Sequence, residues 1–512
     1  MFKKNYINNI LYLSSILLIL LQFSCVQSNR RENIIVASAG KIESLDPAQA
    51  NTLRTIQILS ALGDTLYKIN KEGNLYPSLA TDLPKVSKDG LLIDIPLREN
   101  VTFHDGSIFN AKAMKFSLDR FMKIGTLNYL LNDKVEAIQV KDEFLLRIKL
   151  KKPSSSLKSL LTSVNLTPIS PSSYSKYKNK FNNKTFIGTG PYLLEDFSSN
   201  QQIIKPYKNY WGQKPLNKGI DFINYSSSST LFGALKAKEV DVLISNSIDD
   251  MQRLALNNMV KNEKLNSGQG EPLEIGFITL RSNKFPLKNK TIREAISYTL
   301  DRELISQQVS FGLRKPLRSI VPPQLHKKEL SPWPKYDPDF ARFLLKKEGY
   351  CETDILTIPL TFRSNVPADK LLALTWKDQI KRDLSDCIKI TLNGIESTTV
   401  YKQLSEGAFE AVILDWTGAY PDPEAYLNPL LSCNEIENNI CLKGEAVFSG
   451  SFWGNNEVKE LLQKSEELEG ELRLKNLIKV EQLAAKGGAY IPVWLVNPKA
   501  WSLKDISQPE FS

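Results

Sequence analysis

Apolar and polar residues alternate along the chain with two different periods. Several segments repeat an apolar residue every three or four positions, which places those residues on one face of a helix. Shorter segments are rich in branched aliphatic residues, which is typical of buried strands. Strands and helices that alternate in more than one block favour α/β lobes over an all-α or all-β fold. The predicted helices are 52–67, 111–121, 292–300, 337–348, 368–384 and 457–483, and the predicted strands are 34–37, 91–97, 144–150, 356–362, 388–392 and 411–414.

The amino-terminal segment has a different pattern. Lys3 and Lys4 precede an almost purely apolar run of twelve residues from Ile10 to Leu21. As a helix, this run spans about 18 Å. A helix that crosses a bilayer needs roughly 20 residues, or about 30 Å, so the run is too short. The basic start and the short apolar run predict a signal peptide over residues 1–25 and therefore an exported, soluble body. The alternative is a signal anchor that is not cleaved.

Cys25 closes this segment and directly follows the small residue Ser24. The arrangement resembles the cleavage site of bacterial lipoproteins, although that pattern prefers leucine three residues before the cysteine, where this chain has Gln22. We interpret Cys25 as a lipidation site. This interpretation predicts a lipid-anchored protein of the periplasm or cell envelope. The alternative is ordinary signal cleavage nearby, which releases a free periplasmic protein.

Four further cysteines lie in the body of the chain. An oxidising compartment favours disulfides, and four cysteines allow three pairings. Cys433 and Cys441 are eight residues apart in a polar segment, so they are the preferred pair. Cys351 and Cys387 are the remaining candidates. Zinc binding by the same four residues is disfavoured because their spacing does not match a zinc site.

The composition excludes several kinds of chemistry. His104 and His326 are the two histidines of the chain, which disfavours a multi-histidine metal site and a histidine-based catalytic triad. The chain contains neither a GxSxG nor an HExxH motif, so we predict a protein without catalysis, metal or cofactor. The net charge of +10 is mild over 512 residues, and no Lys/Arg tract is dense enough for nucleic acid. It suits work near an anionic lipid surface.

A set of motifs then identifies a family. The stretch LRENVTFHDG at 97–106, followed by NAK at 110–112 and FSLDR at 116–120, resembles a hallmark of the family 5 extracellular solute-binding proteins. These are the dipeptide- and oligopeptide-binding components of ABC importers. Further matches follow in the family's order: GTGPY at 188–192, NYWGQKP at 209–215, REAISYTLDRELI at 293–305, YDPDFARFLLKKEGY at 336–350, WTGAYPDP at 416–423 and FWGNNEV at 452–458.

The resemblance implies an α/β periplasmic-binding-protein fold of two lobes joined by a hinge, with an extra domain on the first lobe. It implies a monomeric receptor that captures peptides or peptide-like solutes between the lobes and delivers them to a membrane permease and its ATPase. The alternatives are an oligosaccharide or metal chelate as solute, or an envelope chaperone or signalling lipoprotein. The expected domains are domain I at 26–70, 188–280 and 490–512, domain II at 71–187, and domain III at 281–489.

The resemblance points to one ligand-binding segment in the first lobe. In peptide-binding relatives, an extended stretch shortly after the Leu-Asp-Pro turn pairs with the peptide backbone as an added strand. The matching residues here are Asn51, Thr52 and Leu53. The same residues equally fit the start of a helix with Asn51 as its N-cap.

A second ligand-binding segment is WTGAYPDP at 416–423. In those relatives, an aspartate three places after this tryptophan pairs with the free amino group of the peptide, and here that position is Ala419. Loss of the partner of a buried ammonium costs about 3–5 kcal/mol. A free α-amine therefore cannot be bound in the usual way, which shifts the expectation toward modified or blocked peptides. Trp416 and Tyr420 would form apolar walls, with the core as the alternative for Trp416.

Other polar residues of this segment are candidates for the missing contact. Strand alternation would put Asp415, Thr417 and Ala419 on one face. Asp415 would then serve a different part of the ligand, because four residues of strand span about 13 Å. Asp422 also qualifies, although a residue between two prolines more often shapes a turn. Gly418 completes the predicted set.

Overall fold

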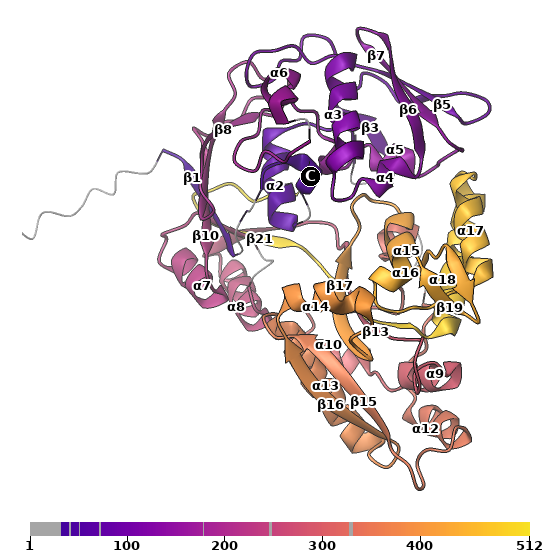
Figure 1. The fold of residues 1–512 in the computed structure, drawn as a ribbon. Helices are drawn as coiled ribbons and strands as arrows, with labels where there is room; N and C mark the ends of the chain where they lie inside the picture. The colour runs from indigo at the N-terminus through magenta and orange to yellow at the C-terminus, as the bar shows by residue number, and fades with distance from the viewer. Residues whose placement is uncertain are drawn as a thin grey trace, which may run out of the picture.

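The computed structural model describes residues 32–511 except 40, 41, 43, 51, 71, 72, 178, 245–247 and 327–330. The predicted signal peptide, its Cys25 and Asn51 lie outside these residues. The described chain forms two α/β lobes and an extra domain on the first lobe, which confirms the predicted fold class (Figure 1). Among its helices, none has the length and apolar character that a membrane crossing requires.

Lobe 1 is built on a seven-stranded sheet. Its central strand β1 pairs in parallel with β10 and β11, and the outer strands are antiparallel to their neighbours. Ile35 and Ala37 of β1 pack with Leu235 and Trp501 in one apolar core. The strands across the sheet are β12 (Leu265–Gln269), β21 (Lys499–Leu503), β11 (Val242–Ile244), β1 (Ile34–Ala39), β10 (Ile220–Tyr225), β9 (Gln201–Pro206) and β8 (Tyr192–Phe197), and helices α2 (Leu53–Leu62), α7 (Ser228–Lys236) and α8 (Asp250–Lys261) pack against them.

The extra domain lies between α2 and β8 in the chain. Its sheet is antiparallel, and the alternating inward residues Leu146 and Ile148 share an apolar cluster with Leu118 of helix α3. Helix α3 starts where the side chain of Asn110 accepts hydrogen bonds from two first-turn amides. The elements are β4 (Lys85–Val86), β5 (Leu92–Pro96), β7 (Leu145–Leu150), β6 (Val135–Asp142), α3 (Ala111–Ile124), α4 (Tyr129–Asn132), α5 (Leu157–Leu160), α6 (Pro171–Tyr174), the hairpin β2 (Tyr67–Ile69) and β3 (Leu75–Pro77), and the 3₁₀ turns η2 (Val164–Leu166) and η3 (Ser175–Tyr177). The 3₁₀ turn η1 (Pro47–Gln49) precedes α2 in the chain and contacts η2.

Lobe 2 is built on a six-stranded mixed sheet that is covered on both faces. Every residue of its strand β20 is buried, as expected for a strand between two layers of helices. The strands across the sheet are β14 (Lys315–Pro316), β20 (Tyr490–Val496), β13 (Glu274–Leu280), β17 (Ala411–Thr417), β15 (Leu356–Arg363) and β16 (Ile388–Ile395). The helices are α9 (Lys290–Tyr298), α10 (Arg302–Ser310), α11 (Pro323–His326), α12 (Pro338–Lys347), α13 (Pro367–Asp383), α14 (Ser397–Gln403), η5 (Leu404–Glu406), α15 (Glu424–Leu431), α16 (Glu445–Phe448), α17 (Asn456–Glu466) and α18 (Gly470–Gly487), with the hairpin β18 (Glu435–Glu437) and β19 (Ile440–Lys443).

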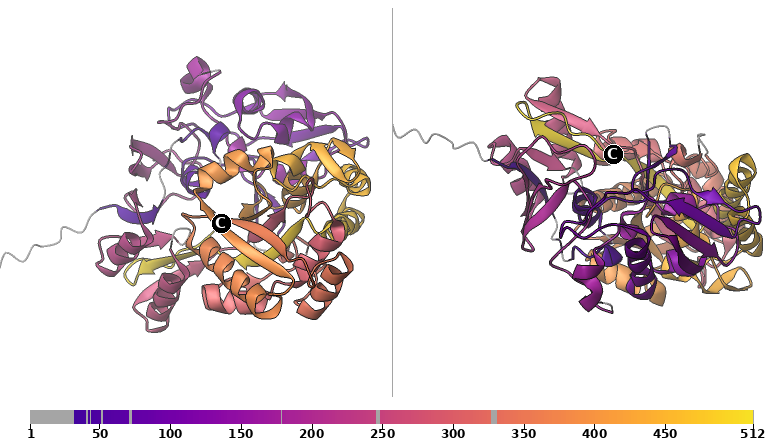
Figure 2. Two further views of the ribbon diagram at one scale, coloured as in Figure 1. Left: turned by 60° about the horizontal axis from the view of Figure 1, so that its bottom comes forward. Right: turned by 90° about the horizontal axis from the view of Figure 1, so that it is seen from above.

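The chain passes between the two large sheets at two neighbouring points. One passage joins β12 to β13, and the other joins β20 to β21. The amide of Gly270 in the first donates a hydrogen bond of 2.9 Å to the carbonyl of Pro498 in the second. Both views of Figure 2 show the yellow strand at the end of the chain lying beside strands of lobe 1. These paired passages are the hinge of the fold. They place β13 and β20 in the sheet of lobe 2, whereas the expected borders at 280 and 490 assigned both strands to domain I.

Two predicted helices end differently in the structure. Helix α2 stops at Leu62 instead of 67, because the chain turns where the amide of Gly190 bonds to the Leu62 carbonyl at 3.0 Å. A Cβ atom on Gly190 would lie 2.4 Å from the backbone of Leu62, so this glycine of GTGPY permits close approach.

The predicted helix 457–483 is two helices, α17 and α18. The amide of Ser155 in the extra domain caps the first of them through the carbonyl of Glu466 at 2.9 Å.

Two disulfides are formed in lobe 2. The sulfur atoms of Cys433 and Cys441 are bonded, and this bond ties β18 and β19 to each other beside α16. The sulfur atoms of Cys351 and Cys387 are also bonded, across the end of α12 and the start of β16.

Candidate functional site

Asp415 lies near the end of β17, close to the hinge passages of lobe 2. Its backbone is opposite Gly276 of β13, and its side chain is 37% exposed. The Nη2 atom of Arg363 lies 2.7 Å from Asp415 Oδ2, and the hydroxyl of Tyr401 donates to Asp415 Oδ1 at 3.3 Å. The carboxylate of Asp415, a predicted ligand-binding residue, is therefore held in place by Arg363 and Tyr401, which the sequence analysis did not single out.

Arg363 is the centre of this polar group. It is the last residue of β15 and is almost fully buried, and its guanidinium donates to Asp369 at 2.7 and 3.1 Å and to the Tyr401 hydroxyl at 2.7 Å. Burial opposes the charge on Arg363, but Asp415 and Asp369 outweigh burial and raise its pKa above the usual value. A charged residue directly after an apolar strand was the available signal in the sequence. We call Arg363, Asp369, Tyr401 and Asp415 the Arg363 cluster.

Glu274 adds a second carboxylate to the same face of the sheet. It is the first residue of β13, directly after a hinge passage, and it pairs with Thr417 in the strand register. Glu274 is half-buried. Burial and then the charge of Asp415 raise the pKa of Glu274, while Arg314, Arg253 and Arg363 act in the opposite direction. The hinge side of lobe 2 thus combines acidic and basic groups.

An arginine that stacks on a tryptophan of lobe 2 also forms an ion pair with lobe 1 next to this face. The indole of Trp494 lies over Gly276, where a Cβ atom would be 2.2 Å from its Nε1. The guanidinium of Arg314 stands over the Trp494 ring at 4.9 Å, and its Nε lies 2.8 Å from Oδ2 of Asp250 on α8 of lobe 1. This ion pair joins the lobes, so it must break or rearrange whenever they separate.

Trp416 and Ala419 lie on the other side of the strand. The indole of Trp416 donates to the carbonyl of Ala425 at 2.8 Å, and both Trp416 and Ala419 pack against an apolar cluster that extends over the extra domain and lobe 2. The expectation that Ala419 shares a face with Asp415 is wrong. Strand β17 ends at Thr417, and Gly418 turns the chain inward against the ring of Tyr426.

The remaining predicted residues of this segment are engaged within the protein. Tyr420 is buried. Both carboxylate oxygens of Asp422 accept hydrogen bonds from Arg473, at 2.8 and 2.7 Å, and Oδ1 also accepts the amide of Glu424 at 2.9 Å. Asp422 therefore shapes the start of α15, which was the alternative reading of a residue between two prolines.

The segment predicted in lobe 1 forms a helix start. Thr52 is the exposed N-cap of α2, and its hydroxyl accepts a hydrogen bond of 3.3 Å from the amide of Thr55. The alternative interpretation expected Asn51 in this role, so it placed the cap one residue early. Leu53 is already the first helical residue, so the extended conformation does not reach it. Thr52 is exposed, and the side chain of Leu53 lies outside the described residues.

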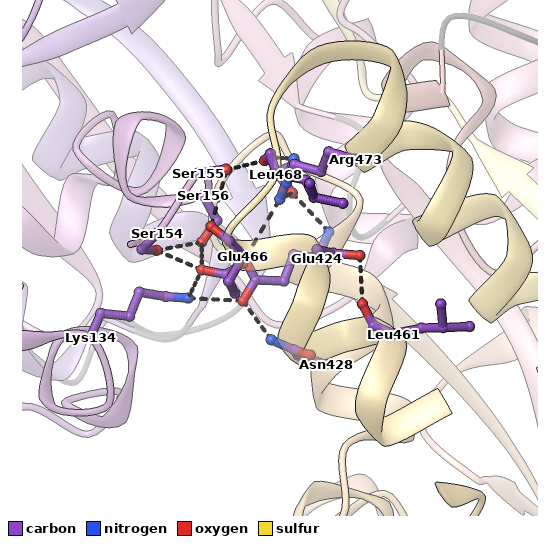
Figure 3. Close-up of polar contacts among 12 residues, drawn as sticks. Lys134, Ser154, Ser155, Ser156, Glu424, Asn428, Leu461, Glu466, Leu468 and Arg473 are labelled. Atoms are coloured by element: carbon purple, nitrogen blue, oxygen red, sulfur yellow. Dashed lines mark hydrogen bonds and ion pairs between the residues drawn. The ribbon is translucent and has the colours of Figure 1, made fainter. Parts of the chain in front are cut away.

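A second polar group lies between the extra domain and lobe 2 (Figure 3). Lys134 Nζ lies 2.9 Å from Oε1 of Glu424 and 2.8 Å from Oε2 of Glu466. The hydroxyls of Ser154 and Ser156 donate to the same Glu466 oxygen at 2.5 and 2.9 Å. All five residues are buried. We call these five residues the Lys134 cluster.

The pKa values of the two carboxyl groups of the Lys134 cluster are shifted in opposite directions. Burial raises the pKa of Glu424 above its usual value, although Lys134 opposes this effect. Burial acts in the same direction on Glu466, but its hydrogen bonds and the charge of Lys134 prevail and lower the pKa of Glu466. The two carboxyl groups therefore differ in their affinity for a proton, and Glu424 is the group whose pKa is raised.

Two cavities open in the described part of the chain away from the Arg363 cluster. One, of about 360 Å³, is lined by Ser331, Pro332, Ile478, Gln482 and Lys486. The other, of about 370 Å³, lies beside the Lys134 cluster at the boundary of the extra domain and lobe 2. Neither is lined by a residue predicted to contact ligand. No group of three or more His, Cys, Asp or Glu side chains in the described chain is arranged to hold a metal ion.

Two hinged α/β lobes with charged groups beside the hinge define the class of solute-binding proteins. The chain belongs to the bacterial extracellular solute-binding proteins, family 5, whose model matches residues 74–438. This match confirms the predicted family.

Curated relatives and solved structures agree with this assignment. The chain is 25% identical over 442 residues to the glutathione-binding protein GsiB of Escherichia coli O6:K15:H31, covering 85% of this chain and 83% of that protein. It is 26% identical to GsiB of Salmonella typhi over 78% of each chain. NikA of Brucella suis in complex with Fe(III)-EDTA has the same fold, with a TM-score of 0.82 at 21% identity over 94% of this chain and 97% of that one. A dipeptide-binding protein of Pseudoalteromonas sp. SM9913 in complex with Met-Leu follows, with a TM-score of 0.78 at 21% identity over 93% and 96%.

Proposed function

We propose that the protein is the substrate-binding component of an ABC importer for peptides or peptide-like solutes. It closes its two lobes on the solute and passes it, chemically unaltered, to a membrane permease that works with an ATPase. The observation that carries the proposal is the pair of hinge passages flanked by charged groups of both signs. Relatives named for glutathione and for a dipeptide support a peptide-like solute, because both molecules carry an amine and a carboxylate.

The solute would meet both lobes close to the hinge. In lobe 2, Asp415 and Glu274 lie on one face of the sheet and offer negative charge for an amine of the solute. Ala419 does not lie on this face. In lobe 1, the exposed start of α2 at Thr52 offers backbone groups. A solute held from both sides stabilises the closed state, because its contacts with the second lobe exist only after closure.

The cellular setting belongs to the same proposal. Acylation of Cys25 would tether a monomeric receptor to the membrane that carries its permease. The mild positive charge suits that surface. Mass spectrometry of the mature protein checks this part: a diacylglyceryl group on Cys25 supports it, and an unmodified terminus elsewhere defeats it.

Binding measurements on the purified full chain test the solute class. Isothermal titration with Met-Leu and with glutathione should give saturable binding with one site per chain. Native mass spectrometry should find such solutes bound after gentle purification, and incubation should return them unaltered. Absence of binding to a broad peptide panel, or cleavage of a bound peptide, would overturn the proposal.

A metal chelate is the second candidate solute, because NikA of Brucella suis was solved with Fe(III)-EDTA. The same titration with Fe(III)-EDTA separates the candidates. Tighter binding of this chelate than of any peptide would favour the second candidate.

A further inference from the structure

Arg54 is a buried arginine that the described chain leaves without a partner. It is the second residue of α2 and is 8% exposed, yet Nε, Nη1 and Nη2 make no hydrogen bond within the described residues. Every other buried arginine of the described chain donates at least one hydrogen bond, as Arg120 does to Asp46 and Arg293 to the carbonyl of Gly487. The guanidinium of Arg54 is therefore an exception that needs a physical reason.

The charge on Arg54 persists despite its burial. Burial lowers the pKa of Arg54 to about 10, which still leaves the guanidinium protonated at neutral pH. A buried charge is costly unless an opposite charge and hydrogen bonds compensate it. An anion bound beside Arg54 would compensate this cost.

The described acidic residues nearest to Arg54 in the chain cannot serve as this anion. Asp46 already accepts both Arg120 nitrogens, at 2.9 and 2.6 Å, and the amide of Asn182 at 2.8 Å. Asp64 accepts the indole of Trp211 at 2.9 Å. No charged group of either sign contributes to the shift in the pKa of Arg54. The compensating anion must therefore come from outside the described chain.

The position of Arg54 on its helix favours an anion as well. Side chains on a helix generally lean toward its amino terminus, which favours a position of the Arg54 guanidinium near the first-turn amides that have no intrahelical partner. These amides and the helix dipole attract negative charge, and the first turn of α2 contains no acidic residue. The helix itself lies between β8 and the extra domain, directly after the exposed Thr52 (Figure 1).

We propose that Arg54 and the amino terminus of α2 form an anion subsite that takes a carboxylate group of the captured solute. A carboxylate matches the planar fork of a guanidinium, which can donate two parallel hydrogen bonds to it. The inference rests on the proposed function and extends it, because it assigns the negative end of the solute to lobe 1. The acidic groups Asp415 and Glu274 of lobe 2 then face its positive end.

The first experiment compares Met-Leu with its C-terminal amide by isothermal titration. In the wild type, the free carboxylate should bind about ten- to a hundredfold more tightly than the amide. Arg54→Gln should remove this difference by weakening Met-Leu alone. Arg54→Lys keeps the charge without the fork and should give an intermediate loss. The control Arg382→Gln removes an exposed arginine of lobe 2 and should change neither ligand.

A second measurement does not depend on peptide binding. The Nε–H resonance of Arg54 in ¹⁵N-arginine-labelled wild type should shift on titration with acetate, and inorganic phosphate serves as the competing source of anion. A shift with acetate, together with failure of every peptide to bind, would keep the subsite and reject the proposed function. An Arg54→Gln variant that still distinguishes acid from amide, a resonance indifferent to acetate, or a response to phosphate alone would overturn the inference.

Discussion

The Lys134 cluster and the start of α2 bury positive charge in opposite ways. Lys134 sits between two carboxylates, and two serine hydroxyls complete the hydrogen bonds of one of them. Arg54 is buried to a similar degree and makes no hydrogen bond with the described chain. The first arrangement compensates its charges internally and so contributes to the folded state. The second leaves a charge uncompensated, which is useful only to a protein that receives an anion.

The two regions also differ in what they connect. The Lys134 cluster joins the extra domain to lobe 2, so it exists only while these parts are in contact. Arg54 belongs to lobe 1 alone. We therefore expect changes in the Lys134 cluster to alter stability and lobe closure, and changes at Arg54 to alter recognition of the solute.

The largest expected effect follows from removing Lys134. Lys134→Met leaves the Glu466 carboxylate buried without its cation, so unfolding free energy should fall by about 3–5 kcal/mol. Urea unfolding followed by circular dichroism measures this loss. Lys149→Met, which breaks an exposed pair with Glu136, is the matched control and should cost less than about 1 kcal/mol. Equal losses in the two variants would contradict the distinction between compensated buried and exposed pairs.

The next effect has the opposite sign. Arg54→Met replaces an uncompensated buried charge by an apolar chain of similar length, so the ligand-free protein should gain about 1–3 kcal/mol. Thermal unfolding without added solute or carboxylate buffer measures this gain. A loss of stability would mean that Arg54 has a partner within the protein, and the contrast with Lys134 would disappear.

A smaller effect depends on pH. Because the pKa of Glu424 is raised in the folded state, its contribution to stability is present below the usual carboxyl pKa and is lost as pH rises through the raised value. Glu466 has a lowered pKa, so its contribution is lost only at acidic pH, below the usual carboxyl range. Glu424→Gln should therefore gain stability relative to the wild type as pH rises from about 5 upward. The slope cannot exceed about 1.4 kcal/mol per pH unit.

Unfolding free energies of the two proteins, measured in urea over this pH range, check the slope. A constant difference between Glu424→Gln and the wild type at all pH values would show that the pKa of Glu424 is not raised in the folded state. The statement that the charges of the Lys134 cluster compensate one another would then lack support.

The smallest effect is expected at Asp415. Asp415→Asn should weaken peptides with a free amine about fivefold, because this half-exposed carboxylate is already shared with Arg363. Isothermal titration with Met-Leu and with its N-acetyl form measures the change, and the acetylated form should be unaffected. Asp119→Asn, which removes an exposed carboxylate of the extra domain paired with Lys115, is the control. Equal weakening of both forms would remove Asp415 from the recognition of amines.

Local sequence patterns determined many elements of this protein directly. The predicted strands 91–97, 144–150 and 356–362 correspond to β5, β7 and β15, and helix 368–384 corresponds to α13. These elements follow from which residues must face away from water, and that requirement repeats with the period of the backbone. The ordered motifs likewise predicted the family, which the family-model match over residues 74–438 confirms.

Only the tertiary structure decided which charges meet. Lys134 lies 290 and 332 residues away from its partners Glu424 and Glu466, and no periodicity relates positions so far apart. The same holds for the pairing of Arg363 with Asp415 and for the break between α17 and α18, which Ser155 of the extra domain caps from another part of the chain. Hydrophobic periodicity predicts which face of each segment is buried. Compensation of buried charge, or the lack of it at Arg54, depends on which segments fold against one another.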